Sequence, residues 1–132
     1  MSLRLIINTI GSLSLFIVFT ITSCDKNDPE VCIKGKLLIK GICMNYVIQD
    51  VDGVLGAEAI ESSWRDPSTG TTYANVFALG SPCDFPLSIE EGQEFSFTVD
   101  MSGGAPGCGV CQAYRPVPAK SLKIKVCNKG VQ

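Results

Sequence analysis

Apolar and polar side chains alternate in two stretches of the C-terminal half of the chain. In residues 95–99 the apolar positions are Phe95, Phe97 and Val99, and residues 122–126 repeat the pattern with lysines at the polar positions. A period of two is typical of a β-strand that buries one face, because successive side chains point to opposite sides. The pattern therefore predicts two half-buried strands, over 95–99 and 122–126.

Three further stretches are rich in apolar and β-branched residues and are bounded by turn residues. They predict strands over residues 33–40, 45–49 and 73–79. Residues 57–63 follow a glycine and precede an Asp-Pro pair, which favours two turns of helix. The predicted fold class is all-β: a small antiparallel β-barrel or sandwich of about five strands with one short helix, stapled by disulfides.

The first 23 residues differ in character from the rest of the chain. They are mostly apolar from Leu5 to Phe19 and carry a single charge, at Arg4. Polar residues interrupt the apolar stretch, which argues against the alternative, a permanent transmembrane helix of about 20 apolar residues. A short positive start followed by an apolar core is typical of a secretory signal peptide. The predicted organisation is a signal peptide over 1–23, a modified cysteine and flexible tether over 24–31, and a single β domain over 32–132.

The end of the predicted signal peptide carries a more specific mark. The residues Ile21-Thr22-Ser23-Cys24 resemble the lipobox of bacterial lipoproteins. The resemblance implies that Cys24 becomes the first residue of the mature chain and carries a thioether-linked diacylglycerol, with a further acyl chain such as palmitate on its amine. Two or three such chains anchor a protein stably, at about 0.8 kcal/mol per buried CH₂ group. The alternative is that Cys24 belongs to the disulfide framework.

The polar tether after this cysteine bears on where in the cell envelope the protein lies. An Asp at position 25 resembles an inner-membrane retention mark of enteric bacteria, whereas the acidic segment from Asp25 to Glu30 resembles surface-export marks of Bacteroidota lipoproteins. The order of predicted strands between Lys34 and Val126, with a cysteine-rich loop before the last, resembles that of small OB-like lipoproteins of Bacteroidota. These resemblances imply a lipid-anchored envelope protein in the outer membrane, with exposure at the cell surface as an open alternative.

Six of the seven cysteines remain once Cys24 is assigned to the lipid, and they predict a disulfide framework. An even number of cysteines in an exported chain is typical of such a framework. Fifteen pairings are possible, and spacing alone does not choose among them. We expect the first to pair with the last, and the second and third each to pair with one of the fourth and fifth. In chain order the six are Cys32, Cys43, Cys83, Cys108, Cys111 and Cys127.

The spacing Cys108-x-x-Cys111 allows two other interpretations. A thioredoxin-like redox pair needs a helix after the first cysteine to lower the thiol pKa, but Pro116 and Pro118 follow closely and disfavour that helix. A zinc site needs a second closely spaced pair or histidines, and Cys32 and Cys43 are separated by ten residues. Structural disulfides are therefore the favoured interpretation.

The chain has no histidine, which excludes the Ser-His-Asp and Cys-His forms of catalysis and any His-ligated metal. Eleven basic and thirteen acidic residues leave a net charge of −2, which disfavours a nucleic-acid binder that works through overall charge. Asp50, Asp52 and Glu61 have the outer spacing of a calcium loop, but Val54 and Leu55 stand where a ligand and a glycine are needed. We therefore predict no catalytic residue, no cofactor and no metal.

Two groups of residues are candidate binding surfaces. Trp64, Arg65 and Tyr73 together offer an aromatic platform and a cation for a sugar ring, although core or loop packing is the alternative use. Six lysines would form a basic stripe if the first and last strands were neighbours, with protection of strand edges as the alternative. These lysines are Lys34, Lys36, Lys40, Lys120, Lys123 and Lys125.

Two hypotheses about function follow from these features. The first is a non-enzymatic, lipid-anchored envelope module that binds a glycan, an envelope component or a protein partner, with the membrane as its other partner and no nucleic acid. The alternative is a periplasmic or surface thiol-redox factor or enzyme that uses Cys108 and Cys111.

The anchor can be tested through the cysteine at its centre. Cys24→Ser removes the thiol to which a diacylglycerol would attach, so we expect the protein to leave the membrane fraction and to appear in the soluble fraction. The measurement is sedimentation of cell membranes followed by detection of the protein, with Cys32→Ser as the control that should still sediment. Retention of the Cys24→Ser protein on membranes would contradict the predicted anchor.

Overall fold

The structure is a computed structural model that describes residues 31–103, 108–109 and 111–127. The signal peptide, the lipobox with Cys24 and the tether up to Glu30 lie outside the described residues. The described part contains seven strands and two short 3-10 turns, and no α-helix. These elements are β1 (Ile33–Lys40), η1 (Ile42–Met44), β2 (Tyr46–Asp50), β3 (Glu61–Arg65), β4 (Thr72–Leu79), η2 (Pro82–Asp84), β5 (Glu94–Val99), β6 (Ser121–Leu122) and β7 (Ile124–Val126).

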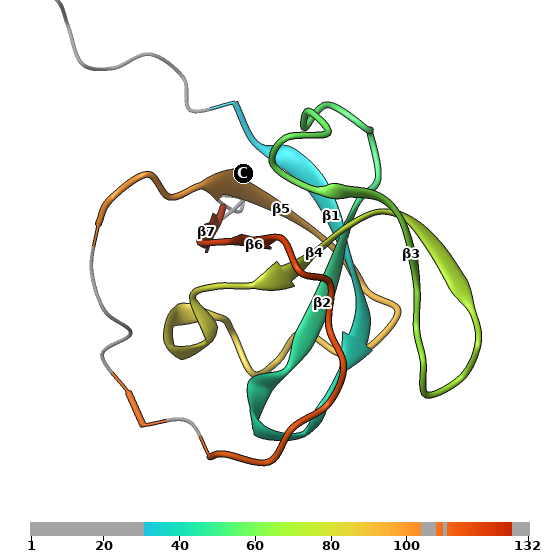
Figure 1. Ribbon diagram of the computed structural model, residues 1–132. Helices are drawn as coiled ribbons and strands as arrows, with labels where there is room; N and C mark the ends of the chain where they lie inside the picture. Colours follow the sequence, from blue (N-terminus) through green and yellow to red (C-terminus); the bar gives the residue numbers. More distant parts are fainter. Residues whose placement is uncertain (1–30, 104–107, 110, 128–132) are drawn as a thin grey trace, which may run out of the picture.

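The strands form one curled sheet in the order β3-β4-β2-β1-β5-β7, and the short β6 pairs with β4 in parallel (Figure 1). The C-terminal segment 121–126 thus pairs with β4 at its start and with β5 at its end. It spans the gap between the two sides of the curled sheet, which gives a barrel-like arrangement that is not a closed barrel. The predicted all-β, OB-like fold class is confirmed, since OB folds are small, partly open barrels.

The predicted helix over 57–63 is wrong. Residues 57–59 form only a turn, in which the amides of Ala59 and Ile60 both donate to the carbonyl of Gly56. Ile60 is then buried in the core, and the following residues extend as β3 alongside β4. Burial of Ile60 and pairing with a neighbouring strand override the local helix preference. The single strand predicted over 122–126 is also divided, into β6 and β7 on either side of Lys123.

The inner face of the sheet encloses the main hydrophobic core. The rings of Phe77 on β4 and Phe97 on β5 are fully buried, with centroids 5.8 Å apart. Gly35 on β1 allows this packing, because a Cβ atom there would lie 2.8 Å from the Phe97 ring. The buried members of this inner cluster are Leu37, Tyr46, Ile48, Ile60, Phe77, Leu79, Phe85, Phe97 and Ile124.

A second, smaller cluster lies on the outer face of the sheet. Its buried members are Ile39, Val47 and Val76. β1 contributes to both faces because its register with β2 shifts between Leu37 and Ile39, where a bulge interrupts the alternation. The partly buried residues packed on this outer cluster are Leu38, Trp64, Tyr73 and Val117.

Three disulfides join distant parts of the chain, in the pairing expected from the sequence. Cys32 before β1 is bonded to Cys127 after β7, with their Cα atoms 6.5 Å apart. The other two bridges are Cys43–Cys111 and Cys83–Cys108, with Cα separations of 5.1 and 5.6 Å. All three Cα separations lie in the normal range for disulfides. Two of them hold the connection between β5 and β6 against the rest of the domain.

Candidate functional site

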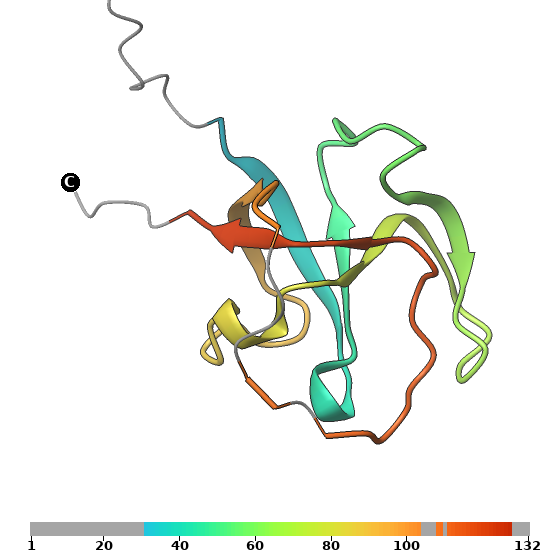
Figure 2. The ribbon, with the colours of Figure 1, turned by 60° about the vertical axis from the view of Figure 1, so that its left-hand side comes forward.

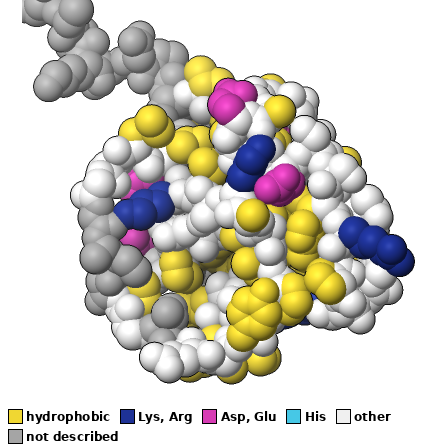
Figure 3. All heavy atoms as spheres, in the orientation of Figure 1, with side chains coloured by type: hydrophobic (Ala, Val, Ile, Leu, Met, Phe, Trp, Pro, Cys, Tyr) yellow, Lys and Arg dark blue, Asp and Glu magenta, His cyan; other side chains and the backbone are white. Residues whose placement is uncertain are grey.

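The hairpin of β3 and β4 brings Trp64 and Tyr73 together, as the aromatic platform requires. The two residues are cross-strand partners, and their rings stack with centroids 6.1 Å apart at an angle of 21°. Both side chains are partly exposed and rest on the outer cluster. Figure 3 shows hydrophobic side chains gathered on this face of the molecule, around β2 and the neighbouring hairpin. We call Trp64 and Tyr73 the aromatic pair.

Arg65 does not join the aromatic pair. It follows Trp64 on a strand, so its side chain projects to the opposite face of the hairpin. There its Nε donates a hydrogen bond of 3.1 Å to the carbonyl of Gly70, in the turn between β3 and β4. The expectation that Arg65 would supply the cation beside the aromatic rings is therefore not met.

A different arginine, Arg115, lies close to the start of the β3–β4 turn, next to Asp66. Arg115 lies on the connection between β5 and β6, and its Nη2 donates to Oδ2 of Asp66 at 3.1 Å. Asp66 is fully buried, and it also accepts hydrogen bonds from the amide of Ser68 and the hydroxyl of Thr69. The sequence gives no sign of this pair, because 49 residues separate its members.

These contacts set the charge of the Asp66 carboxyl. Burial works to raise its pKa, but the hydrogen bonds from Ser68, Thr69 and Arg115, together with the positive charge of Arg115, outweigh burial. The pKa of Asp66 therefore lies below its ordinary value, and the ionised form is the one that the fold stabilises. About a quarter of the Arg115 side chain remains exposed (27%), so the pair is open to solvent on one side.

Part of the surface that OB-like barrels use for ligands is covered here by the chain itself. Such barrels bind oligosaccharides or oligonucleotides on the face of their second and third strands, between the first and last of their loops. In this chain those strands are β2 and β4, and Val117 packs on the outer cluster to which they contribute.

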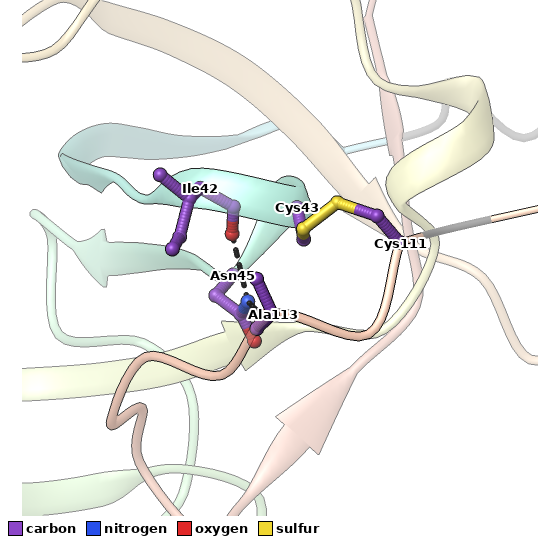
Figure 4. Close-up of a disulfide and its surroundings, with 5 residues drawn as sticks. All are labelled: Ile42, Cys43, Asn45, Cys111 and Ala113. Carbon is purple, nitrogen blue, oxygen red and sulfur yellow. Dashed lines mark hydrogen bonds between the residues drawn. A yellow bond between two sulfur atoms is a disulfide. The ribbon is translucent and has the colours of Figure 1, made fainter.

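The two loops that would flank such a ligand are also fastened to each other (Figure 4). Cys43 in η1 is bonded to Cys111, and the side-chain amide of Asn45 donates to the carbonyls of Ile42 and Ala113 at 2.7 and 2.9 Å. This arrangement joins the two loops at the η1 end of the domain. The aromatic pair, at the outer end of the hairpin, remains accessible.

The lysines do not form the basic stripe considered from the sequence. β5 lies between β1 and β7, so the first and last strands are not neighbours. Several of the lysines are instead paired with acids: Lys34 with Glu94, Lys40 with Glu90 and Lys125 with Asp100. Lys120 donates to the carbonyls of Ala57 and Ile60.

The described residues contain no cluster of Cys, Asp or Glu arranged to hold a metal ion. Asp50, the first residue of the rejected calcium loop, is buried and accepts hydrogen bonds from the amides of Gly53 and Leu55 at 3.0 and 2.7 Å. It serves as the cap of its turn. An open hollow of about 430 Å³ lies over β1 and β5 and is lined by Lys34, Glu94, Phe95, Ser96, Val126 and Cys127.

Comparisons with known proteins find no family model, no curated protein and no solved structure that matches the chain. Within the described residues, no helix is both long enough and apolar enough to cross a membrane.

The pair of buried Asp66 and partly exposed Arg115 predicts an acid-sensitive contribution to stability. Asp66→Asn removes the negative charge of a carboxylate that accepts hydrogen bonds from three donors. We expect the free energy of unfolding at pH 7 to fall by about 1–3 kcal/mol. The pKa of Asp66 is lower in the folded protein than in the unfolded chain, where it is about 3.9. The ionised carboxylate therefore contributes its full share to the free energy of unfolding above about pH 4, and this share is lost as the pH falls through the pKa of the folded protein. Urea unfolding with intact disulfides, from neutral to strongly acidic pH, measures this difference.

The exposed Asp52 provides the matched control for that experiment. Asp52→Asn should change the free energy of unfolding by less than about 0.5 kcal/mol at every pH. A difference between the wild-type and Asp66→Asn proteins that stayed constant down to acidic pH would contradict a role for the ionised carboxylate.

Proposed function

We propose that the chain is a lipid-anchored protein of the bacterial cell envelope, whose β domain is a non-enzymatic module that binds a glycan or another envelope component. The anchor rests on the lipobox-like residues Ile21-Thr22-Ser23-Cys24 and on the polar tether that follows them. A disulfide-rich domain is consistent with an oxidising compartment outside the cytoplasm.

The observation that carries the binding function is the aromatic pair. Stacked rings that are partly exposed offer a flat apolar surface, which is what the C–H face of a sugar ring packs against. Gln49 lies nearby, because its Nε2 donates to the carbonyl of Ala74, the neighbour of Tyr73. Its side-chain oxygen supplies a polar group of the kind that orients a hydroxyl-bearing ligand.

The covered face of the barrel limits the size of the ligand that this surface takes. Val117, from the segment between β5 and β6, packs on the outer cluster of the β2–β4 face. The aromatic pair stands at one end of that face, on a hairpin that extends beyond β2. This geometry favours recognition of one or two sugar units at the end of a chain over a long oligosaccharide laid across the barrel.

The redox alternative gains no support from the disulfide pairing. A dithiol catalyst alternates between two free thiols and a bond between those same two cysteines. Here Cys108 is bonded to Cys83 and Cys111 to Cys43, so the two cysteines of the short segment belong to different bridges. Each bridge joins parts of the chain that are distant in sequence, as structural disulfides do.

Binding is tested on a glycan array with the purified full chain. Trp64→Ala removes one half of the stack, and we expect binding to weaken about tenfold for the glycans that the wild-type protein retains. Trp64→Phe should lose less, since a smaller ring remains. The control is Tyr114→Ala, which removes an exposed aromatic ring that lies outside the pair. Equal binding by wild-type and Trp64→Ala proteins, both folded by circular dichroism, would remove the aromatic pair from the site.

The second test counts free thiols in the native, oxidised protein. We expect none to be titrated among the six cysteines of the domain, because each is bonded to another in the fold. Mass spectrometry after thiol labelling reports each cysteine separately. Ready labelling of Cys108 and Cys111 alone would favour the redox factor over the binding module.

A further inference from the structure

The large apolar side chains that the described fold leaves exposed divide between its two ends. At the end where β1 begins they are Val31, Val51, Val54 and Met101, which we call the tether-end residues. At the end where β1 stops and η1 follows, which we call the η1 end, they are Ile42, Leu87 and Tyr114. The chain arrives from Cys24 at the first of these ends.

The pairing of β1 with its two neighbours places the tether-end residues together. β1 begins at Ile33, which is opposite Phe97, and the antiparallel β5 then continues past the start of β1 to Met101. On the other side of β1, the amide of Val51 donates to the carbonyl of Lys34 at 2.9 Å. Figure 1 and Figure 2 both show the start of β1 and the loop after β2 at the top of the molecule.

The loop after β2 holds its apolar side chains in different environments. The carboxylate of Asp50 fixes this loop by accepting the amide of Leu55 at 2.7 Å. Leu55 packs against the inner cluster, whereas its neighbour Val54 is 62% exposed. Val31 and Met101 are still more exposed, at 83% and 90%. Exposed apolar side chains that gather at one site mark a surface for a partner or a membrane.

The length of the tether determines which end of the domain faces the membrane. Six residues separate Cys24 from Val31, and a chain of that length spans at most about 25 Å. The eight residues of β1 are themselves about 26 Å long. To rest the η1 end on the bilayer, the tether would have to run back along the whole of β1 in a fully extended form. The end at which β1 begins is therefore the one that meets the bilayer.

We propose that the tether-end residues contact the surface of the phospholipid bilayer, an inference that rests on the lipid anchor at Cys24 in the proposed function. Apolar side chains that enter the headgroup region gain free energy by leaving water. The charges beside this end are balanced, because Lys34 is paired with Glu94 and Lys125 with Asp100. Balanced charge suits zwitterionic headgroups such as phosphatidylcholine, whereas anionic lipids are recognised by clusters of basic residues.

This contact orients the candidate site away from the lipid. Gly41 directly follows β1, and a Cβ atom there would lie 2.9 Å from Cδ of Arg115. The guanidinium of Arg115 meets Asp66 at the start of the hairpin turn, so this turn lies toward the η1 end. The aromatic pair, on the strands next to the turn, is then presented to ligands outside the membrane.

Photolabelling of the full-length, lipidated protein on phosphatidylcholine vesicles tests the contact. The vesicles contain a phospholipid with a diazirine near the headgroup end of its acyl chain, and mass spectrometry locates the adducts. We expect about fivefold more adducts on the tether-end residues than on Leu87 and Tyr114, which are comparably exposed. These two belong to the η1 end, since the carbonyl of Leu87 accepts from Lys40 and Tyr114 follows the residue bonded to Asn45.

Two matched double variants test the same surface by adding charge. Val54→Asp with Met101→Asp makes insertion of the tether end unfavourable, and should lower the adducts on Val31 and Val51 about threefold or more while the protein still floats with the vesicles. The control, Leu87→Asp with Tyr114→Asp, adds the same charge at the η1 end and should leave the adducts unchanged. Circular dichroism verifies that both variants are folded.

The outcomes distinguish this contact from the anchor on which it rests. A wild-type protein that does not float with vesicles lacks the anchor, and the contact then fails together with the proposed function. A protein that floats but carries adducts equally at both ends overturns the contact and leaves the anchor in place. A Cys24→Ser protein that forms dimers by light scattering, and loses them on Met101→Asp, would assign this surface to a second copy and overturn the contact as well.

Discussion

The connection between β5 and β6 is the constraint on which the rest of the domain depends. Residues 100–120 contain no strand or helix in their described part, and ordering so long a segment carries a large entropic cost. The bridges from Cys108 to Cys83 and from Cys111 to Cys43 reduce that cost, because they restrict the same segment in the unfolded chain. Held in this way, the segment covers the outer cluster and delivers the guanidinium that meets the buried carboxylate of the hairpin turn.

Much of the fold could be predicted from the sequence, because the alternation of apolar and polar residues directly indicates a half-buried strand such as 95–99. β3 escaped prediction because Glu61–Arg65 is a mostly polar edge strand, without the apolar face that produces the pattern. The expected helix over 57–63 failed because pairing with β4 decides the conformation there. Of the candidate site, the stacking of Trp64 on Tyr73 was predictable, whereas the partner of Asp66 depends on a long-range contact that no local pattern encodes.

The hairpin of β3 and β4 places the aromatic pair next to the face of the barrel on which Val117 packs. In a minimal barrel of this type the second and third strands carry the ligand, and here the chain's own segment takes that place. The hairpin extends the sheet by one strand past the covered region, and the aromatic pair lies on this added part. Trp64 thus lies on the edge strand of the sheet, and Tyr73 lies opposite it on the next strand.

The bulge in β1 has a consequence for how the protein tolerates change. Leu37, Leu38 and Ile39 are three consecutive apolar residues, and in a regular strand they would place two side chains on one face and one on the other. The register shift lets Leu37 serve the inner cluster while both of its successors pack against the outer one. The two hydrophobic layers are therefore linked through one short stretch of backbone, so a change in the number of residues there would disturb both layers at once.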